Sequence, residues 1–405
     1  MPLLVEEMAG VRTAAVSWLV PAGNATDPCD EAGDGWSSLL AELAQRGAGE
    51  RNSREYSDAL DRAGVQRAVT PSAVHIVVSA TTIGARIHEA LPLLSDLIVR
   101  PHLPSEALDA VRSLAIQSLE SLQDDPQHRV SLRLRERHLP PPFNRTGYGN
   151  RVAFEQASID ALRDDWRRRV RPVGSILAVA GAVNADDLAR SLDRLLRDWH
   201  GVAEDVRATG PSIGGALHEE DASNQTHIAI GLDAPNERDP DSLLCRLATI
   251  ILGGESSSRL FTEVRERRGL CYAVNAGYAG GRDRGMVALY AGSTPDRAQE
   301  TLDTMRAELE RFEHGVTPDE FRRAIVGMKS RLVMQGESTA ARSAALSSDW
   351  YRLGRARSLG ELSAEVDAVS LDALNGWISK GMTGAWRARR TLCTVGQRPL
   401  EIAGF

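Results

Sequence analysis

The sequence is poor in lysine and in aromatic residues, and each shortage narrows the class of protein. Arginine supplies nearly all the positive charge, since the only lysines are Lys329 and Lys380. The net charge is −7, which argues against a nucleic-acid-binding domain, because such domains usually carry a basic face. Aromatic residues make up only 5% of the chain, so its cores must consist mainly of aliphatic side chains.

Paired cysteines and long apolar runs are also missing. Cys29, Cys245, Cys271 and Cys393 are scattered, and no Cys-x-x-C occurs, which favours free thiols in a reducing compartment. No apolar run approaches the length of a membrane span, and the N-terminal residues do not have the pattern of a signal peptide. We therefore expect a soluble, cytoplasmic protein, and its arginine and alanine content indicates a GC-rich bacterial genome.

The first half of the chain mixes strand and helix patterns. A polar loop is expected at 24–34 and a proline-rich turn at 139–143, and Ser158 is a predicted N-cap. The predicted strands are 11–23, 73–82 and 175–183, and the predicted helices are 35–47, 53–64, 83–98, 104–122, 158–170 and 184–199.

The second half repeats this order after residues 201–223, which show little periodicity and are interpreted as a linker. The predicted strands are 226–235, 271–281, 285–292 and 391–396, and the predicted helices are 240–252, 257–267, 296–313, 317–334, 336–353 and 370–382.

A short internal match supports a duplication. SIDALRDDW at 158–166 is mirrored by SLDALNGW at 370–377, and each leads to a short apolar strand that ends in glycine. We predict an α+β fold with two related domains, at 1–200 and 224–405, joined by the linker. Strands followed by runs of helices favour an antiparallel-rich sheet packed with helices in each domain.

The stretch GGESSSRLFTEVRERRGLCYAV at 253–274 combines a glycine pair, several arginines and the start of a predicted strand. It lacks both G-x-x-x-x-G-K-[ST] and G-x-G-x-x-G, and helical spacing precedes it, so a nucleotide site is not expected. The glycines are predicted to separate two helices. Taken alone, Arg265 would be interpreted as a solvated charge and Tyr272 as a core residue.

A self-sufficient hydrolase has little support in the sequence. The G-x-S-x-G match at 210–214 lies in the expected linker, whereas a nucleophile elbow joins a strand to a helix. Neither H-E-x-x-H nor H-x-x-E-H occurs anywhere in the chain, so no zinc motif is present.

The stretch 253–274 nevertheless resembles the second-domain signature of the pitrilysin-type (M16, inverzincin) zinc peptidases, roughly G-G-G-x-S-S-R-L-F-x-x-[VL]-R-E-x-x-G-L-x-Y. Glu255 replaces a glycine of that signature, and the opening strand and the segments 179–201 and 225–242 also follow the family's course. The matching residues are Gly253, Gly254, Ser257, Ser258, Arg259, Leu260, Phe261, Val264, Arg265, Glu266, Gly269, Leu270 and Tyr272.

The chain departs from this family at the zinc motif. The family places H-x-x-E-H on the helix after the first strand, because two imidazoles on one helix face hold zinc and the glutamate activates water. Here Ser38 and Glu42 stand at the histidine positions, and Ala41 stands at the position of the general base. The apolar face of the helix remains, so the helix is kept while its metal chemistry is lost.

The third zinc ligand of the family is a glutamate shortly before a D-D-P-like turn. Gln117 and Ser118 best occupy that place before the turn at 124–126, and Glu120 is close enough to leave the register open. A single carboxylate would not restore a zinc site without the histidines.

The resemblance therefore implies the subunit of a two-chain peptidase that binds no metal itself. Such a subunit forms half of a clamshell with a homologous H-x-x-E-H partner, which holds the zinc, and supplies Arg265 and Tyr272 to the partner's active site. Gly253 and Gly254 are implied to contact the peptide substrate. The alternative is a purely structural or peptide-binding member of the family with no part in catalysis.

Overall fold

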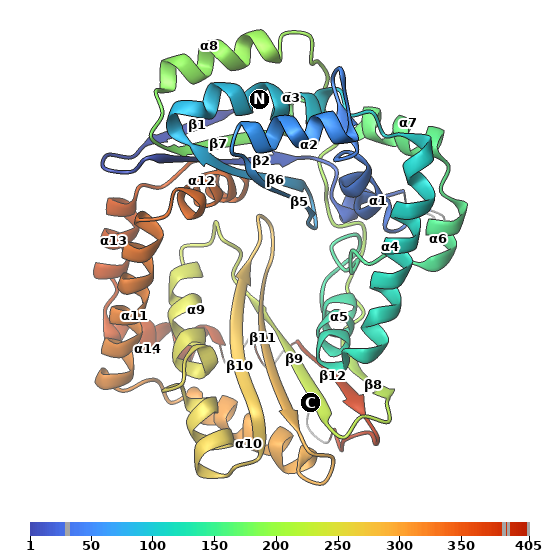
Figure 1. The fold of residues 1–405 in the computed structure, drawn as a ribbon. Coiled ribbons are helices and arrows are strands. Elements are labelled where there is room, and N and C mark those ends of the chain that lie inside the picture. Colours follow the sequence, from blue (N-terminus) through green and yellow to red (C-terminus); the bar gives the residue numbers. More distant parts are fainter. Residues whose placement is uncertain (29–32, 383–385, 387–388, 403–405) are drawn as a thin grey trace. The chain divides into compact units, whose positions relative to one another are not determined.

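The computed structural model describes residues 1–28, 33–382, 386 and 389–402. These residues form two compact units, and each unit is built around a five-stranded sheet (Figure 1). Unit 1 contains Met1–Ser121, Pro141–Thr209 and Gln335–Ala356. Unit 2 contains Leu122–Pro140, Gly210–Met334 and Arg357–Phe405.

The sheet of unit 1 has the strand order β1-β7-β2-β6-β5, in which β1 and β7 are parallel and the other neighbours are antiparallel. The strands are β1 (Leu3–Glu7), β2 (Thr13–Val20), β5 (Gln66–Pro71), β6 (Ile76–Ile83) and β7 (Ile176–Gly181). A separate hairpin is formed by β3 (Gly47–Ala48) and β4 (Arg51–Asn52).

Helices cover both faces of this sheet. They are α1 (Trp36–Leu43), α2 (Ser53–Arg62), α3 (Ile87–Val99), α4 (Leu108–Ser121), α6 (Arg151–Gln156), α7 (Ile159–Arg169), α8 (Ala185–Leu195) and α12 (Thr339–Leu353). Alternate residues of a strand face opposite sides, so Val16 and Trp18 of β2 enter the large core. Ser17 of the same strand faces α12, where its hydroxyl lies 2.8 Å from that of Ser347.

The sheet of unit 2 has the order β10-β11-β9-β12-β8, again with one parallel pair, β12 and β8, at an edge. The strands are β8 (Gly215–Glu220), β9 (Thr226–Ala234), β10 (Cys271–Gly280), β11 (Gly285–Ser293) and β12 (Arg390–Gly396). The helices are α5 (Pro126–His138), α9 (Ser242–Thr249), η5 (Ile250–Gly254), η6 (Phe261–Arg267), α10 (Ala298–Phe312), α11 (Pro318–Gly336), α13 (Leu359–Asp367), α14 (Leu371–Trp377) and η7 (Ile378–Met382).

The two sheets therefore share one topology, and the antiparallel-rich α+β fold expected from the sequence is confirmed. The matched sequences at 158–166 and 370–377 begin equivalent helices, α7 and α14. The hydroxyl groups of Ser158 and Ser370 cap these helices by accepting hydrogen bonds from the N–H groups of Ala161 and Ala373, at 3.3 and 3.1 Å. In each unit the helix leads to a buried strand, β7 or β12, which pairs in parallel with the edge strand of its sheet.

The segment 201–223, interpreted as a linker, contains a strand. Residues 215–220 form β8, which occupies the same place in its sheet as β1 does in unit 1. The side chains of β8 are exposed or half-buried, so the segment lacks the apolar alternation by which strands are recognised. The division of the chain into domains at 1–200 and 224–405 stays a prediction about its duplicated halves.

Each unit takes one helix from the other half of the chain. Helix α5 lies in the first half of the sequence but packs on β9 and β12 of unit 2, and α12 lies in the second half but packs on β2 and β7 of unit 1 (Figure 1). In unit 1 the buried Arg342 of α12 donates two hydrogen bonds, of 2.8 and 2.5 Å, to the carboxylate of Glu6 in β1. In unit 2 the buried His138 of α5 lies 2.9 Å from the Thr391 hydroxyl of β12.

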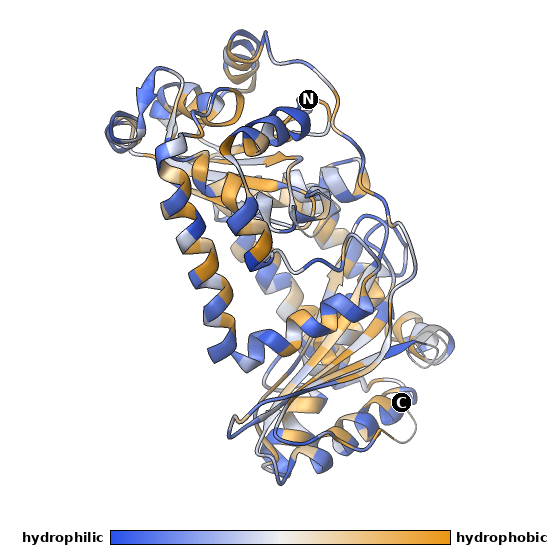
Figure 2. Ribbon diagram, turned by 90° about the vertical axis from the view of Figure 1, so that its right-hand side faces the viewer, coloured by the Kyte–Doolittle hydropathy of each residue, from blue (hydrophilic) through white to orange (hydrophobic). Residues whose placement is uncertain are grey.

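Hydrophobic residues gather on the strands and on the helix sides that meet them, while the outer sides of the helices are hydrophilic (Figure 2). No helix in the described part of the chain is long and apolar enough to cross a membrane.

Helix α5 packs tightly over Gly231 of β9. A Cβ atom at Gly231 would lie 2.9 Å from the His138 ring and 3.0 Å from Leu134. We predict that Gly231→Ala lowers the free energy of unfolding by about 1–3 kcal/mol, because α5 must shift to admit the methyl group. Gly277→Ala in β10 of the same sheet is the matched control, since it has no neighbour within 4 Å.

Denaturant unfolding of both variants measures this difference. Gly277→Ala is expected to leave stability unchanged or to raise it slightly. Equal stability of the two variants would show that α5 does not depend on the missing side chain at position 231.

Candidate functional site

The arginine-rich helix η6 ends abruptly at a glycine. Gly269 has a φ of +60°, a conformation that favours glycine, and its N–H group donates to the carbonyl of Arg265 at 3.0 Å. The N–H group of Leu270 donates to the carbonyl of Val264 at 2.9 Å, which completes a helix stop. The chain therefore leaves the helix and enters β10 within a few residues of Arg265.

A bulge at the start of β10 turns Tyr272 outward. In the pairing with β11, Cys271 lies opposite Ser293 and Ala273 lies opposite Gly292, so Tyr272 is the extra residue. Bulges commonly redirect a side chain at the edge of a sheet, and β10 is an edge strand. The Tyr272 side chain is 79% exposed, so its interpretation as a core residue from the sequence pattern alone is wrong.

Arg265 lies beside Tyr272 and is held by aromatic rings. Its guanidinium carbon is 5.4 Å from the centroid of the Tyr272 ring and 4.7 Å from the centroid of the Phe261 ring, both within the range of cation–π contacts. Within the described part of the chain, the Arg265 side chain makes no hydrogen bond and no ion pair. All its N–H donors, and the exposed hydroxyl of Tyr272, are therefore available to a ligand.

Two of the other arginines in this stretch, Arg259 and Arg267, are occupied by structural contacts. Arg259 donates to both carboxylate oxygens of Glu320, at 2.6 and 2.9 Å, and to the carbonyl of Gly315 at 2.8 Å. Burial acts to raise the pKa of Glu320, but the hydrogen bonds from Arg259 and Thr317 lower it to about 2. Arg267 pairs with Glu263 one helical turn away. Arg265 thus differs from Arg259 and Arg267 in having no carboxylate partner.

The two glycines expected to contact a substrate differ in their surroundings. Gly253 is buried against β10, and a Cβ atom there would lie 2.7 Å from both the backbone nitrogen and the Cβ of Ala276. Gly254 is exposed, and its nearest neighbour would be Ile250 at 3.4 Å. The geometry gives Gly253 a packing role between η5 and β10, and substrate contact by either glycine stays a prediction.

The three cysteines that the structure describes carry little thiolate at neutral pH. Burial raises the pKa of the Cys271 thiol to about 11, although the nearby Arg265 guanidinium acts to lower it. Burial also raises the pKa of the Cys245 and Cys393 thiols to about 12. All three are free cysteines, and Cys29 lies outside the described residues. None of the three has the low pKa of a nucleophilic cysteine.

The positions of the zinc motif lie on α1 in unit 1. The Ser38 hydroxyl donates to the carbonyl of Gly147 at 3.0 Å, and Ala41 is buried in the core. The carboxylate of Glu42 faces Arg46 at 3.4 Å, one turn away on the same helix. The side chains of Ser38 and Glu42 therefore make structural contacts within unit 1.

The expected place of the third ligand is on α4, which packs against α1. Gln117 and Ser118 are exposed there, and the Ser118 hydroxyl donates back to its own helix at the carbonyl of Leu114. Glu120 forms an ion pair with Arg151. Among the residues that the structure describes, no three histidine, cysteine or acidic side chains are placed to hold a metal ion.

A buried ion pair fixes the start of α1, and sequence analysis missed it. Asp27 accepts hydrogen bonds from the N–H groups of Gly35 and Ser37, at 3.0 and 2.9 Å, and from Arg169 at 3.0 Å. Arg169 comes from α7 and also pairs with Asp165. Burial raises the pKa of Asp27 to about 6, against the opposing effects of Arg169 and of the N–H donors. The only signal in the sequence is an acidic residue ahead of a helix.

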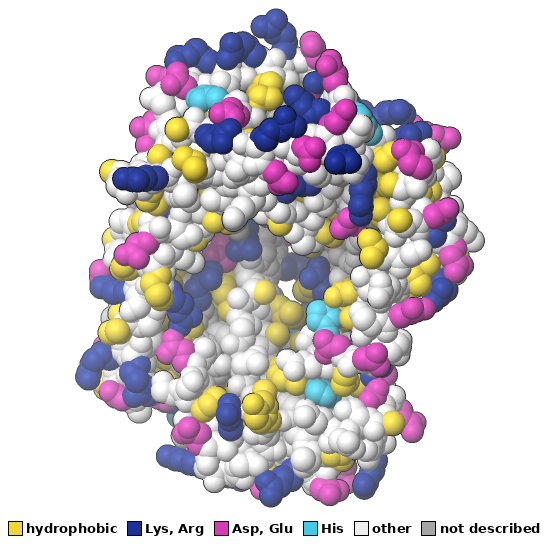
Figure 3. All heavy atoms as spheres, in the orientation of Figure 1, with side chains coloured by type: hydrophobic (Ala, Val, Ile, Leu, Met, Phe, Trp, Pro, Cys, Tyr) yellow, Lys and Arg dark blue, Asp and Glu magenta, His cyan; other side chains and the backbone are white. Residues whose placement is uncertain are grey.

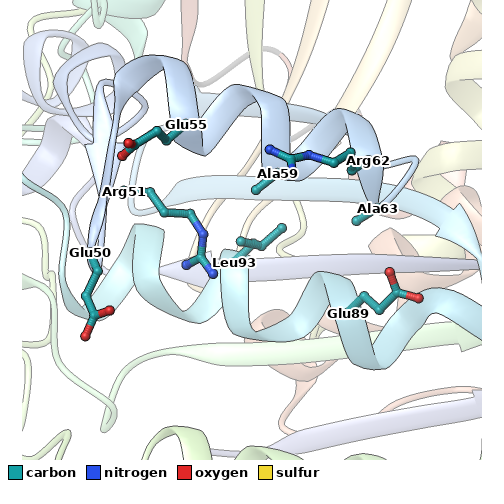
Figure 4. Close-up of a pocket in the computed structure, with 8 residues that line it drawn as sticks. All are labelled: Glu50, Arg51, Glu55, Ala59, Arg62, Ala63, Glu89 and Leu93. Carbon is teal, nitrogen blue, oxygen red and sulfur yellow. The ribbon is translucent and has the colours of Figure 1, made fainter.

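An open pocket of about 580 Å³ in unit 1 includes none of the predicted site residues in its lining (Figure 4). The β3–β4 hairpin, α2 and α3 supply its walls, which mix acidic and basic side chains. The lining residues are Glu50, Arg51, Glu55, Ala59, Arg62, Ala63, Glu89 and Leu93. On the face drawn in Figure 3, basic and acidic side chains are likewise interspersed.

Asp27, ahead of α1, and Glu42, on α1, are expected to contribute very different amounts to the free energy of unfolding. Asp27→Ala leaves Arg169 with one buried partner fewer and removes acceptors from the helix start, so we expect a loss of about 3–5 kcal/mol in unfolding free energy. Glu42→Ala removes a half-exposed pair and is expected to cost less than about 1 kcal/mol. Thermal and denaturant unfolding measure both effects, and a similar cost for the two variants would contradict this assignment.

Gly253 and Gly254 allow a second comparison. We predict that Gly253→Ala lowers unfolding free energy by about 1–3 kcal/mol, because its methyl group meets the backbone of β10. Gly254→Ala has room for its methyl group and is expected to be nearly neutral. If Gly253→Ala were as stable as wild type, the close approach of η5 to β10 would not need glycine.

Two family descriptions match the chain one after the other. Residues 3–142 match "Insulinase (Peptidase family M16)", and residues 156–328 match "Peptidase M16 inactive domain". An uncharacterized zinc protease of Streptomyces coelicolor is 24% identical over 386 residues, which are 91% of this chain and 83% of that protein. An uncharacterized zinc protease of Bacillus subtilis is 24% identical over 389 residues, which are 92% of this chain and 91% of that protein.

Solved structures share the fold at low sequence identity. A crystal structure described as the peptidase M16 inactive domain from Pseudomonas fluorescens has a TM-score of 0.88 and 17% identity, covering 99% of this chain and 97% of that chain. A protease from Helicobacter pylori has a TM-score of 0.86 and 15% identity, covering 97% and 96%. With both halves matched and the fold shared throughout, the chain belongs to peptidase family M16, the pitrilysin-type zinc peptidases.

Proposed function

We propose that this chain is the subunit without zinc in a heterodimeric zinc metallopeptidase, and that it supplies Arg265 and Tyr272 to the active site of its partner. The observation that carries the proposal is the pairing of an exposed tyrosine with an arginine that has no carboxylate partner in the described residues. The residues at the zinc-motif positions, Ser38, Ala41 and Glu42, support the same assignment, since none of them can replace a histidine ligand and a general base together.

The proposed partner is a homologue that carries H-x-x-E-H, and its zinc activates water for attack on a peptide bond. Negative charge develops on the carbonyl oxygen during that attack, and a tyrosine hydroxyl can donate a hydrogen bond to it as it forms. A guanidinium can orient the peptide through charge-assisted hydrogen bonds. In this proposal Tyr272 is the donor to the developing charge and Arg265 orients the substrate and the tyrosine.

The substrate is proposed to be a peptide that adds as an extended strand to a sheet edge of the partner. The two subunits would form the halves of a clamshell around it. The free thiols of Cys245, Cys271 and Cys393 support a reducing location such as the cytoplasm.

Peptide cleavage by an H-x-x-E-H homologue from the same organism tests the proposal. The homologue is assayed alone, with this chain, and with its Arg265→Ala and Tyr272→Phe variants. We expect no activity without this chain, full activity with the wild-type chain, and a fall of about 10²–10³ in kcat for Tyr272→Phe, which is the usual effect of losing one donor to a developing oxyanion. Arg265→Ala is also expected to lower activity sharply, because it removes the group that orients the substrate and the tyrosine.

Arg267→Ala provides the matched control, because Arg267 is exposed on the same helix but pairs with Glu263. It is expected to keep full activity. A chain that changes nothing, or donor variants that work as well as wild type, would favour the alternative of a structural or peptide-binding protein.

A chain of complex III2 from Candida albicans has a TM-score of 0.80 to this chain and 16% identity, which shows a shared fold alone.

A further inference from the structure

We propose that Phe261 is a positioning residue, whose ring holds the Arg265 guanidinium beside Tyr272 so that the arginine donors are presented together with the tyrosine hydroxyl. This inference rests on the proposed function, because it concerns how the same donor pair is arranged. Phe261 is then the third residue of this arrangement, and it acts through Arg265.

The geometry places one cation against two rings. Phe261 and Arg265 are four residues apart in η6, which is a π-helix of about one and a half turns, so their side chains lie on nearly the same side of it. The guanidinium carbon is 4.7 Å from the Phe261 centroid, which is closer than its 5.4 Å distance from Tyr272. Phe261 is half-buried and packs against the core of unit 2, whereas Tyr272 is 79% exposed. Phe261 is therefore the fixed member of the cluster.

A ring holds an arginine in a way that a carboxylate cannot. Glu320 and Glu263 fix Arg259 and Arg267 by accepting some of their N–H groups, so those donors are directed at a carboxylate. A guanidinium stacked on an aromatic face keeps its N–H groups free, because they lie in the plane of the group and point away from the ring. The Arg265 side chain makes no hydrogen bond or ion pair in the described residues, so removal of the Phe261 ring would leave it free to adopt other rotamers.

Cys271 provides a reporter of the position of Arg265 that needs neither partner nor substrate. The guanidinium acts to lower the pKa of this thiol. Alkylation proceeds through the thiolate, so displacement of the cation slows the reaction of Cys271. General loosening of the structure has the opposite effect, because it exposes the partly buried thiol and speeds the reaction. The direction of change therefore separates loss of positioning from loss of folding.

The experiment measures the rate of Cys271 alkylation by iodoacetamide at mildly alkaline pH, by mass spectrometry of the peptide that contains it. The variants are Arg265→Ala, Phe261→Leu and Phe261→Tyr, with Arg267→Ala as the control. Phe261→Leu keeps an apolar side chain for the core, and Phe261→Tyr keeps the ring. We expect Arg265→Ala and Phe261→Leu to slow alkylation severalfold, and Phe261→Tyr and Arg267→Ala to match wild type.

The same variants are then assayed for cleavage with the H-x-x-E-H partner. Slower alkylation in Phe261→Leu, with a lower kcat that Phe261→Tyr restores, supports the positioning role. Unchanged or faster alkylation in Phe261→Leu, while Arg265→Ala slows it, overturns that role whatever the cleavage result. Slow alkylation in Phe261→Leu with cleavage that is insensitive to Arg265→Ala supports positioning and overturns the proposed function instead.

Discussion

The whole fold depends on contacts between distant parts of the chain, as the ion pair between the buried Arg342 and the half-buried Glu6 shows. It joins residues 336 positions apart and fixes α12, from late in the chain, on the first sheet. His138 and Thr391 make the corresponding contact between α5 and the second sheet, 253 positions apart. Each sheet is therefore covered on one face by a helix from the other half of the chain, and neither half of the sequence contains a complete unit.

Within unit 2, most of the arginine-rich stretch is scaffold. Gly253 allows η5 to approach β10, Arg259 joins η6 to α11, and Gly269 ends the helix. These contacts fix the two ends of the segment on which Arg265 and Tyr272 lie. A rigid support of this kind is what a donor pair needs, because hydrogen bonds to a transition state depend on donors placed before the reaction begins.

The sequence predicted the elements whose own residues carry a periodic signal. The alternation in β6, the apolar strand β9 and the capped helices at Ser158 and Ser370 were recognised because local propensity and packing agree there. Strands β1, β5 and β8 and helices α5, α6 and α13 were missed. Of these, β1, β8 and α5 are stabilised by partners far away in the chain. The bulge at Tyr272 and the charge buried at Asp27 were missed for the same reason, because both depend on tertiary pairing that no local pattern encodes.

The exchange of helices also sets the order in which the protein can mature on the ribosome. The last strand of the first sheet, β7, ends at Gly181, but α12 begins only at Thr339. Helix α5 is made early, yet β12, on which it packs, begins at Arg390. The sheet face under α12 and the buried apolar residues of α5, Val130 and Leu134, therefore stay uncovered through most of synthesis. Exposed surfaces of this kind make nascent chains prone to aggregation and are the usual targets of chaperones.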